Sequence, residues 1–181
     1  MRSVDVHPEE VITTRDFPVH NAEVLERYSA MLRDGDDQGI PPVPLVEVEL
    51  FLPHFDEPEI TLLREFLIEH PDVKYFLLNG SHRTTAANLT RRAIRAVVLE
   101  ALGDIVTARR MTFNGVPYEH GLLDTIDANI RDLVVHFRGT KAFQTVQEKT
   151  AKMVEERAIP ARALGLSRLA AGLLDIGEDI N

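Results

Sequence analysis

The first hundred positions alternate between helical and strand spacing of apolar residues. Behind Asn21, a residue type that favours helix N-caps, apolar side chains recur at three and four positions, until a polar run near residue 35 ends the helix. A second helix is predicted after Asp56, because Glu59 completes a capping-box pattern, and Pro71 stops it. The apolar positions are Val24, Leu25, Tyr28, Met31 and Leu32 in the first helix, and Ile60, Leu63, Phe66 and Leu67 in the second.

Three short runs are typical of strands. Residues 46–50 alternate between apolar and polar, with Glu47 and Glu49 on the polar face, and Pro44 is expected at an edge or outside the ladder. Residues 74–78 form a nearly continuous apolar run, as in a buried strand, and residues 94–99 form another. Between these two runs a helix is predicted from about residue 84 to residue 92, with Ala86, Ala87 and Leu89 as its packing face.

Beyond Asp104 the pattern becomes helical. A long amphipathic helix is predicted over residues 122–137, a second over residues 141–158, and a third after Pro160. The chain is therefore predicted to have a mixed α+β fold, with an α/β domain in residues 1–104 followed by a helical C-terminal extension in residues 105–181.

Composition agrees with this organisation. The 181 residues suffice for one domain with an extension, and 44% apolar and 27% charged residues are ordinary values. No apolar run approaches a membrane span of about 18 residues. No signal peptide is visible either, so a cytoplasmic location is expected. The lack of cysteine excludes disulfides, thiolate zinc sites and a cysteine nucleophile.

Charge is unevenly distributed along the chain, whose formal net charge is −9. Residues 1–78 carry 17 acidic and 6 basic side chains, whereas residues 79–110 carry 6 arginines against 2 acidic residues. One interpretation is an anionic small ligand at this basic segment. The other is ion pairing with the acidic half, which explains Arg91 and Arg92 equally well. The six arginines are Arg83, Arg91, Arg92, Arg95, Arg109 and Arg110.

The basic segment begins with a candidate phosphate-binding loop between a predicted strand and a predicted helix. Backbone N–H groups at a helix N-terminus lack intrahelical acceptors, and the helix dipole adds partial positive charge there. Gly80 would let the backbone approach a phosphate closely. The loop consists of Asn79, Gly80, Ser81, His82, Arg83, Thr84 and Thr85.

Side chains of this loop suit an anion as well. Ser81, Thr84 and Thr85 would offer hydroxyl donors. Arg83 would offer a planar fork for phosphate oxygens, and His82 could donate a hydrogen bond or exchange a proton near neutral pH. The alternative is a plain glycine turn, with Ser81 as helix cap and Arg83 in a surface ion pair.

The wider arrangement resembles the ParB/sulfiredoxin superfamily. The resemblance covers roughly residues 6–102 and includes the segments at 40–43 and 75–87. Its most specific part is Gly80-Ser81-His82-Arg83 with Ala86-Ala87 behind it. It implies a small sheet with flanking helices and a nucleotide bound at the loop.

The loop differs from each subgroup at one position. Sulfiredoxins have Gly-Cys-His-Arg and place ATP there, but Ser81 stands in the cysteine position, which excludes sulfinic acid reduction. Free serine kinases have Asp-Gly-His-His-Arg and use ADP or ATP, but Asn79 replaces their aspartate. ParB proteins have Gly-Glu-Arg-Arg and bind CTP. Arg83 matches their second arginine, whereas their metal-binding glutamate is replaced by serine or histidine.

The resemblance therefore implies an ATP- or ADP-binding protein. With Mg²⁺ on the phosphates, it would act as a phosphotransferase or ATPase on a small hydroxyl-bearing acceptor. Arg83 and the loop amides would hold the phosphates, and His82 would stabilise the transferring group. No dedicated metal site is predicted, because His120 and His136 lack a compact ligand spacing.

The N-terminal segment supplies further candidates. Arg15 lies where family members approach the nucleotide, and Asp16 is the candidate base for an acceptor hydroxyl, with Glu9 or Glu10 as alternatives.

Two other functions stay open. One is a ParB-like, nucleotide-gated module that binds DNA or a protein, with the nuclease activity ascribed to some relatives as a variant, although the acidic balance disfavours nucleic acid. The other is an interaction protein whose amphipathic tail forms a homodimer.

Overall fold

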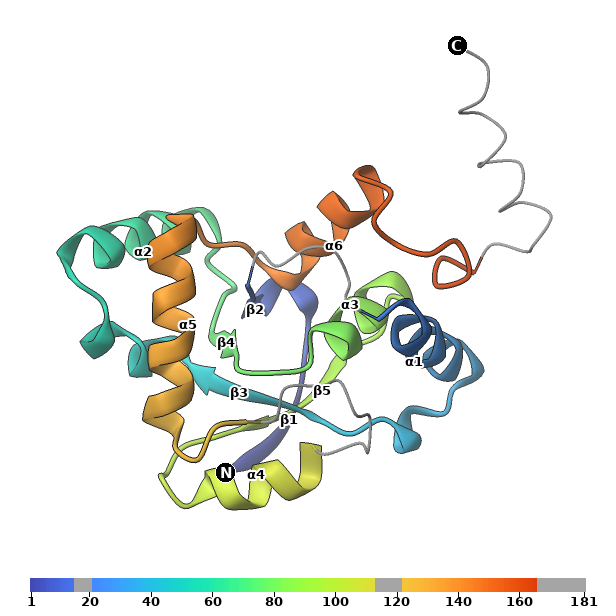
Figure 1. Cartoon of the computed structure of the whole chain (residues 1–181), viewed down its shortest axis with the longest axis horizontal. Coiled ribbons are helices and arrows are strands. Elements are labelled where there is room, and N and C mark those ends of the chain that lie inside the picture. Colours follow the sequence, from blue (N-terminus) through green and yellow to red (C-terminus); the bar gives the residue numbers. More distant parts are fainter. Residues whose placement is uncertain (15–20, 113–121, 166–181) are drawn as a thin grey trace, which may run out of the picture.

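A computed structural model of the chain describes residues 1–14, 21–112 and 122–165. It contains a mixed sheet with the strand order β1-β5-β3-β4-β2, which confirms the predicted α+β class (Figure 1). β1 pairs antiparallel with β5, β5 parallel with β3, β3 antiparallel with β4, and β4 parallel with β2. The strands are β1 (Arg2–Val6), β2 (Val11–Ile12), β3 (Val43–Glu47), β4 (Tyr75–Leu77) and β5 (Ile94–Val98).

Helices cover both faces of this sheet. α1, α3 and α6 pack on one face, and α2, α4 and α5 pack on the other, so the fold has three layers (Figure 1). The helices are α1 (Ala22–Asp34), α2 (Glu57–Glu69), α3 (Ser81–Leu89), α4 (Asp104–Thr112), α5 (Ile126–Thr140) and α6 (Val146–Glu155).

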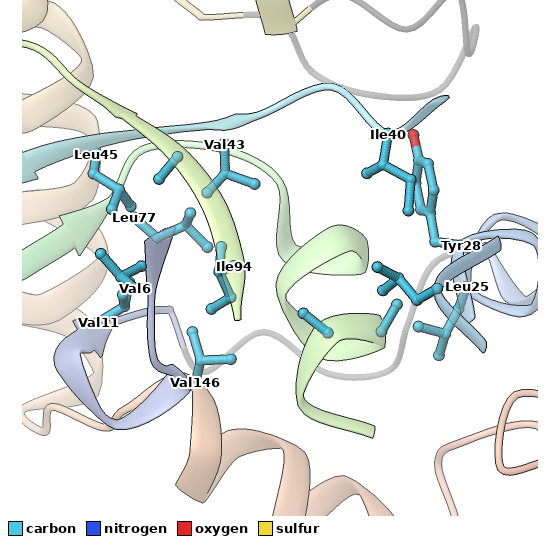
Figure 2. Close-up of a cluster of buried hydrophobic side chains, with 14 of the residues drawn as sticks. Val6, Val11, Leu25, Tyr28, Ile40, Val43, Leu45, Leu77, Ile94 and Val146 are labelled. Carbon is cyan, nitrogen blue, oxygen red and sulfur yellow. The ribbon is translucent and has the colours of Figure 1, made fainter. Parts of the chain in front are cut away.

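Alternation along the strands assigns each side chain to one of two hydrophobic clusters. Leu45 and Leu77 belong to the cluster beneath α1, α3 and α6, which also contains Val146 of α6 (Figure 2). Their neighbours Val46 and Phe76 point to the opposite face, beneath α2 and α5. Because both faces are buried, these strands have nearly continuous apolar sequences.

The described phenylalanines gather on the second face. Phe51 stacks on Phe76 with 3.8 Å between ring centroids, and Phe137 of α5 meets Phe76 edge-on at 5.5 Å. Phe143 contacts this group as well, at 4.9 Å from Phe137. These rings join α5 to the sheet.

The predicted starts of α1 and α2 are confirmed. Asn21 caps α1, with its side-chain oxygen accepting a hydrogen bond from the Val24 amide at 3.1 Å. Asp56 and Glu59 form the predicted capping box of α2, and the Asp56 amide donates to the Glu59 carboxylate at 2.6 Å.

The prediction for Pro44 is wrong. Pro44 lies inside β3, in the centre of the sheet, and pairs with Val97. Its carbonyl accepts a hydrogen bond from the Leu78 amide at 3.0 Å. The carbonyl and nitrogen of one strand residue point to the same side, so the missing N–H of Pro44 also points toward β4. The β3–β4 pairing ends at Leu45 and Leu77, so Pro44 lies just beyond it. At its other end, β3 stops at Glu47, and Glu49 lies in a 3-10 helix (Val48–Leu50) rather than on a strand.

The predicted bounds of α3 and α6 are also corrected. α3 begins at Ser81, immediately after Gly80, and ends at Leu89 because Arg91 adopts a left-handed φ of 55°. α6 begins at Val146 rather than residue 141, because Lys141 is the left-handed C-cap of α5. Residues 161–165, after Pro160, form turns, and the rest of the predicted third helix lies outside the described residues.

Residues on both sides of position 104 share the two clusters. Val146 and Met153 of α6 pack with the first cluster, and Ile130 and Phe137 of α5 pack with the second. The predicted extension thus supplies helices to both faces of the sheet. Within residues 1–14, 21–112 and 122–165, no helix combines the length and apolar character needed for a bilayer crossing.

A pH-sensitive contact joins α2 to α6. His70, at the C-terminus of α2, bonds the Phe66 carbonyl through Nδ1 at 2.9 Å and the Glu148 carboxylate through Nε2 at 3.0 Å. Burial alone would lower the pKa of His70, but these two acceptors outweigh burial and raise it above its ordinary value.

We expect this contact to stabilise the protein at acidic pH. Because the pKa of His70 is higher in the folded than in the unfolded protein, its protonation stabilises the fold. This stabilisation is fully present below the unfolded pKa of about 6.5 and is lost as pH rises through the folded pKa. Urea unfolding of wild type and His70→Gln from pH 5.5 to pH 8.5 should show the wild-type advantage shrinking with pH. A difference that is constant across this range would contradict the assignment.

Candidate functional site

The loop after β4 is built around Gly80. Its φ of 106° and ψ of 31° lie in the left-handed region, which residues with a Cβ rarely adopt. A Cβ here would also lie 2.6 Å from Val43 Cγ1 of β3 and 3.1 Å from Arg83 Nη2. Conformation and packing therefore both require glycine at this position, where the backbone turns directly from β4 into α3.

The start of α3 has no side-chain cap. Gly80 is the N-cap residue and has no side chain to accept hydrogen bonds from the first-turn amides. The first bond of the helix runs from the Thr84 amide to the Gly80 carbonyl, at 3.0 Å. The amides of Ser81, His82 and Arg83 precede it and have no acceptor within a helix of this geometry. Helix N-termini are places where anions commonly bind in proteins.

The predicted hydroxyl donors differ in access. Thr84 and Thr85 are each 1% exposed, and the Thr84 hydroxyl donates back to the Ser81 carbonyl at 3.0 Å. Ser81 and His82 are half-buried at the surface of the loop, as is Asn79. Of the predicted hydroxyls, that of Ser81 is therefore the one at the surface of the loop.

Arg83 faces inward. Its side chain is 3% exposed, and Nη1 donates to the carbonyls of Pro42 at 2.8 Å and Pro41 at 3.2 Å. Nη2 donates to Asn79 Oδ1 at 3.4 Å. The guanidinium thus ties the segment entering β3 to the loop leaving β4, a positioning contact rather than a surface ion pair.

A lysine from α6 meets the loop. Lys149 Nζ donates a hydrogen bond to Ser81 Oγ at 2.6 Å, and Lys149 is 3% exposed. Sequence inspection alone did not find this residue. The signal that could have found it is the helical spacing of Val146, Lys149, Thr150 and Met153, which places the lysine on the buried face of α6.

The segment before α6 is anchored to the N-terminal part of the chain. The Thr13 amide donates to the Gln144 carbonyl at 3.0 Å, and the Gln144 side chain donates to the Thr14 carbonyl at 2.8 Å. Thr145 then caps α6 in a capping box with Glu148. These bonds fix where α6 starts and hence where Lys149 lies.

No protein-family model, curated protein or solved structure matches this chain. Its function has to be inferred from the geometry of the loop and from the residues around it.

The other predicted site residues are distributed as follows. Arg15 and Asp16 lie outside the described residues. Glu10 accepts hydrogen bonds from the Lys74 ammonium at 2.5 Å and the His7 amide at 2.7 Å. Burial would raise the pKa of Glu10, but the His7 amide and then Lys74 outweigh it and lower that pKa. Glu10 is therefore held as a structural carboxylate.

Three of the arginines lie beyond the C-terminal end of α3, two of them in the segment after the helix and Arg95 in β5. Arg91, Arg92 and Arg95 are exposed, and Arg95 Nη1 donates to the Asp37 carbonyl at 2.6 Å. Within the part of the chain that the structure describes, neither Arg91 nor Arg92 forms an ion pair. Pairing with the acidic half therefore does not explain these two residues.

Proposed function

We propose that the loop between β4 and α3 binds the phosphates of a nucleotide, ATP or ADP. The observation that supports this most directly is Gly80, whose left-handed conformation and close packing exclude a Cβ and turn the chain directly from β4 into the N-terminus of α3. Ser81, the residue after Gly80, adds a hydroxyl. The resemblance of this loop to the ParB/sulfiredoxin superfamily supports a nucleotide over a simple anion.

We further propose that the bound nucleotide is a phosphoryl donor. An acceptor hydroxyl would attack the terminal phosphorus and lose its proton to a base, for which Asp16 is the candidate from the sequence. A new P–O bond would form, and the bond to the bridging oxygen would break to release ADP from ATP, or AMP from ADP. With water as the acceptor, the same geometry gives an ATPase. Such catalysis rests mainly on positioning and electrostatic stabilisation, which loop amides and His82 could provide.

Magnesium would enter this site with the nucleotide. The part of the chain that the structure describes contains no group of three side chains suited to hold a metal. Among the described residues of the loop, the half-buried side chains with oxygen atoms are the neutral Ser81 and Asn79. Neutral oxygens suit a Mg²⁺ ion whose charge is already balanced by phosphates. A cytoplasmic location, where ATP and Mg²⁺ are abundant, is part of the same proposal.

Calorimetric titration of MgATP, MgADP and MgCTP into wild type and Ser81→Asp tests the site. A carboxylate in the first turn stabilises a helix but repels a phosphate, so the variant should fold and bind at least about tenfold more weakly. Thr61→Asp, on the exposed face of α2, adds the same charge elsewhere and should bind like wild type. No binding of any nucleotide to wild type would overturn the proposal.

The preferred nucleotide separates the two functional classes. Preference for ATP or ADP, with ADP release that is stimulated by hydroxyl-bearing amino acids, supports phosphotransfer. Preference for CTP, with DNA retardation that depends on it, would favour the ParB-like alternative, for which exposed Arg91, Arg92 and Arg95 are the available phosphate contacts.

A further inference from the structure

We propose that Lys149 supplies the positive charge of the phosphate site, so that the site is completed by α6. This inference rests on the proposed function, because it assigns a residue to the same loop. It also specifies the ligand as a compact group with at least two phosphates.

Distance is the first argument. Lys149 Nζ lies 2.6 Å from Ser81 Oγ, and Ser81 is the first residue of α3. An ammonium has three donors, and the bond to Ser81 places the whole group beside the first-turn amides. A phosphate oxygen bound to those amides would therefore be within reach of the same ammonium. A lysine acts on phosphates as a point charge in this way.

Burial is the second argument. Lysine is rarely buried, because its charge loses hydration, yet Lys149 is 3% exposed. The α6 helix packs against α3, with Val146 and Met153 in the cluster that also contains Ala86 and Ala87 of α3. The packing of α6 on α3 thus fixes the position of this ammonium, in contrast to that of an exposed lysine.

The neighbouring lysine shows the contrast on the same helix. Lys152 follows three residues later, its side chain is 42% exposed, and it pairs with Glu156 at 3.5 Å. It carries the same charge on the same helix, but its ammonium pairs with Glu156, whereas that of Lys149 bonds to Ser81. Lys152 therefore offers a matched control for Lys149.

A fixed ammonium beside helix amides favours ligands by charge. Pyrophosphate, ADP and ATP concentrate several negative charges on neighbouring phosphates, whereas AMP carries a single phosphate. Because the attraction grows with ligand charge, we expect the contribution of Lys149 to be larger for pyrophosphate and ADP than for AMP.

The test is calorimetric titration of pyrophosphate, MgADP and AMP into wild type, Lys149→Met and Lys152→Met. Methionine keeps the length of the side chain and removes its charge. Because hydrogen bonds to charged groups contribute about 1.5–3 kcal/mol, Lys149→Met should weaken pyrophosphate and MgADP binding by about tenfold or more. Lys152→Met should stay within about twofold of wild type for both ligands, as expected of an exposed charge.

The outcomes separate this inference from the proposed function. MgADP binding that is equal in wild type and Lys149→Met overturns the role of Lys149 and leaves the nucleotide site intact. Pyrophosphate binding that depends on Lys149, without nucleotide binding, supports Lys149 and overturns the nucleotide assignment. Wild type that binds neither ligand overturns both.

Thermal unfolding shows whether each variant is folded. If Lys149→Met does not fold, Lys149→Gln replaces it, since this change removes the charge but keeps an amide donor for the Ser81 hydroxyl and leaves the helix amides in place. A severalfold loss of pyrophosphate affinity then supports the inference, and unchanged affinity overturns it.

Discussion

Replacing Gly80 by alanine is expected to lower the free energy of unfolding by about 3 kcal/mol. Left-handed backbone costs a residue with a Cβ about 1–2 kcal/mol, and overpacking adds about 1–3 kcal/mol. The new methyl group would meet Val43 Cγ1 at 2.6 Å, in a buried part of β3 that cannot move freely. Urea unfolding monitored by circular dichroism measures the change.

Two other glycines separate the causes of this loss. Gly35 has a φ of 80° but nothing within 4 Å of an added Cβ, so Gly35→Ala should lose only about 1 kcal/mol, from backbone strain. Gly139, in the last turn of α5, also has nothing within 4 Å, and Gly139→Ala should stabilise by about 0.5 kcal/mol. A Gly80→Ala loss no larger than that of Gly35→Ala would show that the contact with Val43 is unimportant.

Replacing Arg83 by methionine is expected to lower the free energy of unfolding by about 2–3 kcal/mol. The change keeps much of the side-chain volume but removes the donors that hold the Pro41 and Pro42 carbonyls at 3.2 and 2.8 Å. Hydrogen bonds from a charged donor contribute about 1.5–3 kcal/mol, and the carbonyls would lose their partner. The measurement is again urea unfolding.

Arg92→Met is the matched control for Arg83. Arg92 is exposed, so its replacement should change stability by no more than about 0.5 kcal/mol. If Arg83→Met unfolds at the wild-type urea concentration, the guanidinium is not a structural tie. Such a result would favour the prediction that Arg83 binds phosphate directly.

Helices with local start and stop signals could be predicted from the sequence. The caps at Asn21 and Asp56 act on amides within three residues, so the information that sets these helix starts is local. The interior strands β4 and β5 were also predictable, since burial on both faces leaves a continuous apolar run.

The two edge strands were not predictable in the same way. β2 contains only Val11 and Ile12, too few residues for any alternation to be visible. β1 (Arg2–Val6) is largely exposed and owes its conformation to pairing with β5, about ninety residues later in the chain. Pro44 was misplaced for a related reason, because whether its missing N–H matters depends on where the neighbouring β4 ends.

The position of the candidate site could be predicted, but not its composition. Gly80 and Ser81 mark the loop in the sequence, because a glycine and a hydroxyl residue between a strand and a helix indicate a tight turn into a helix N-terminus. The inward orientation of Arg83 depends on two proline carbonyls about forty residues earlier. Lys149 depends on how α6 packs against α3, which no local pattern around Ser81 can indicate.

The sequence separation of Ser81 and Lys149 has a consequence during protein synthesis. They are 68 residues apart, a stretch that a ribosome adding about 5–20 residues per second completes in about 3–14 s. Throughout that interval the nascent chain carries the glycine loop without its ammonium. If Lys149 provides the charge of the site, a truncated product ending before α6 would fail to retain nucleotide, and ligand binding would report that translation had passed residue 149.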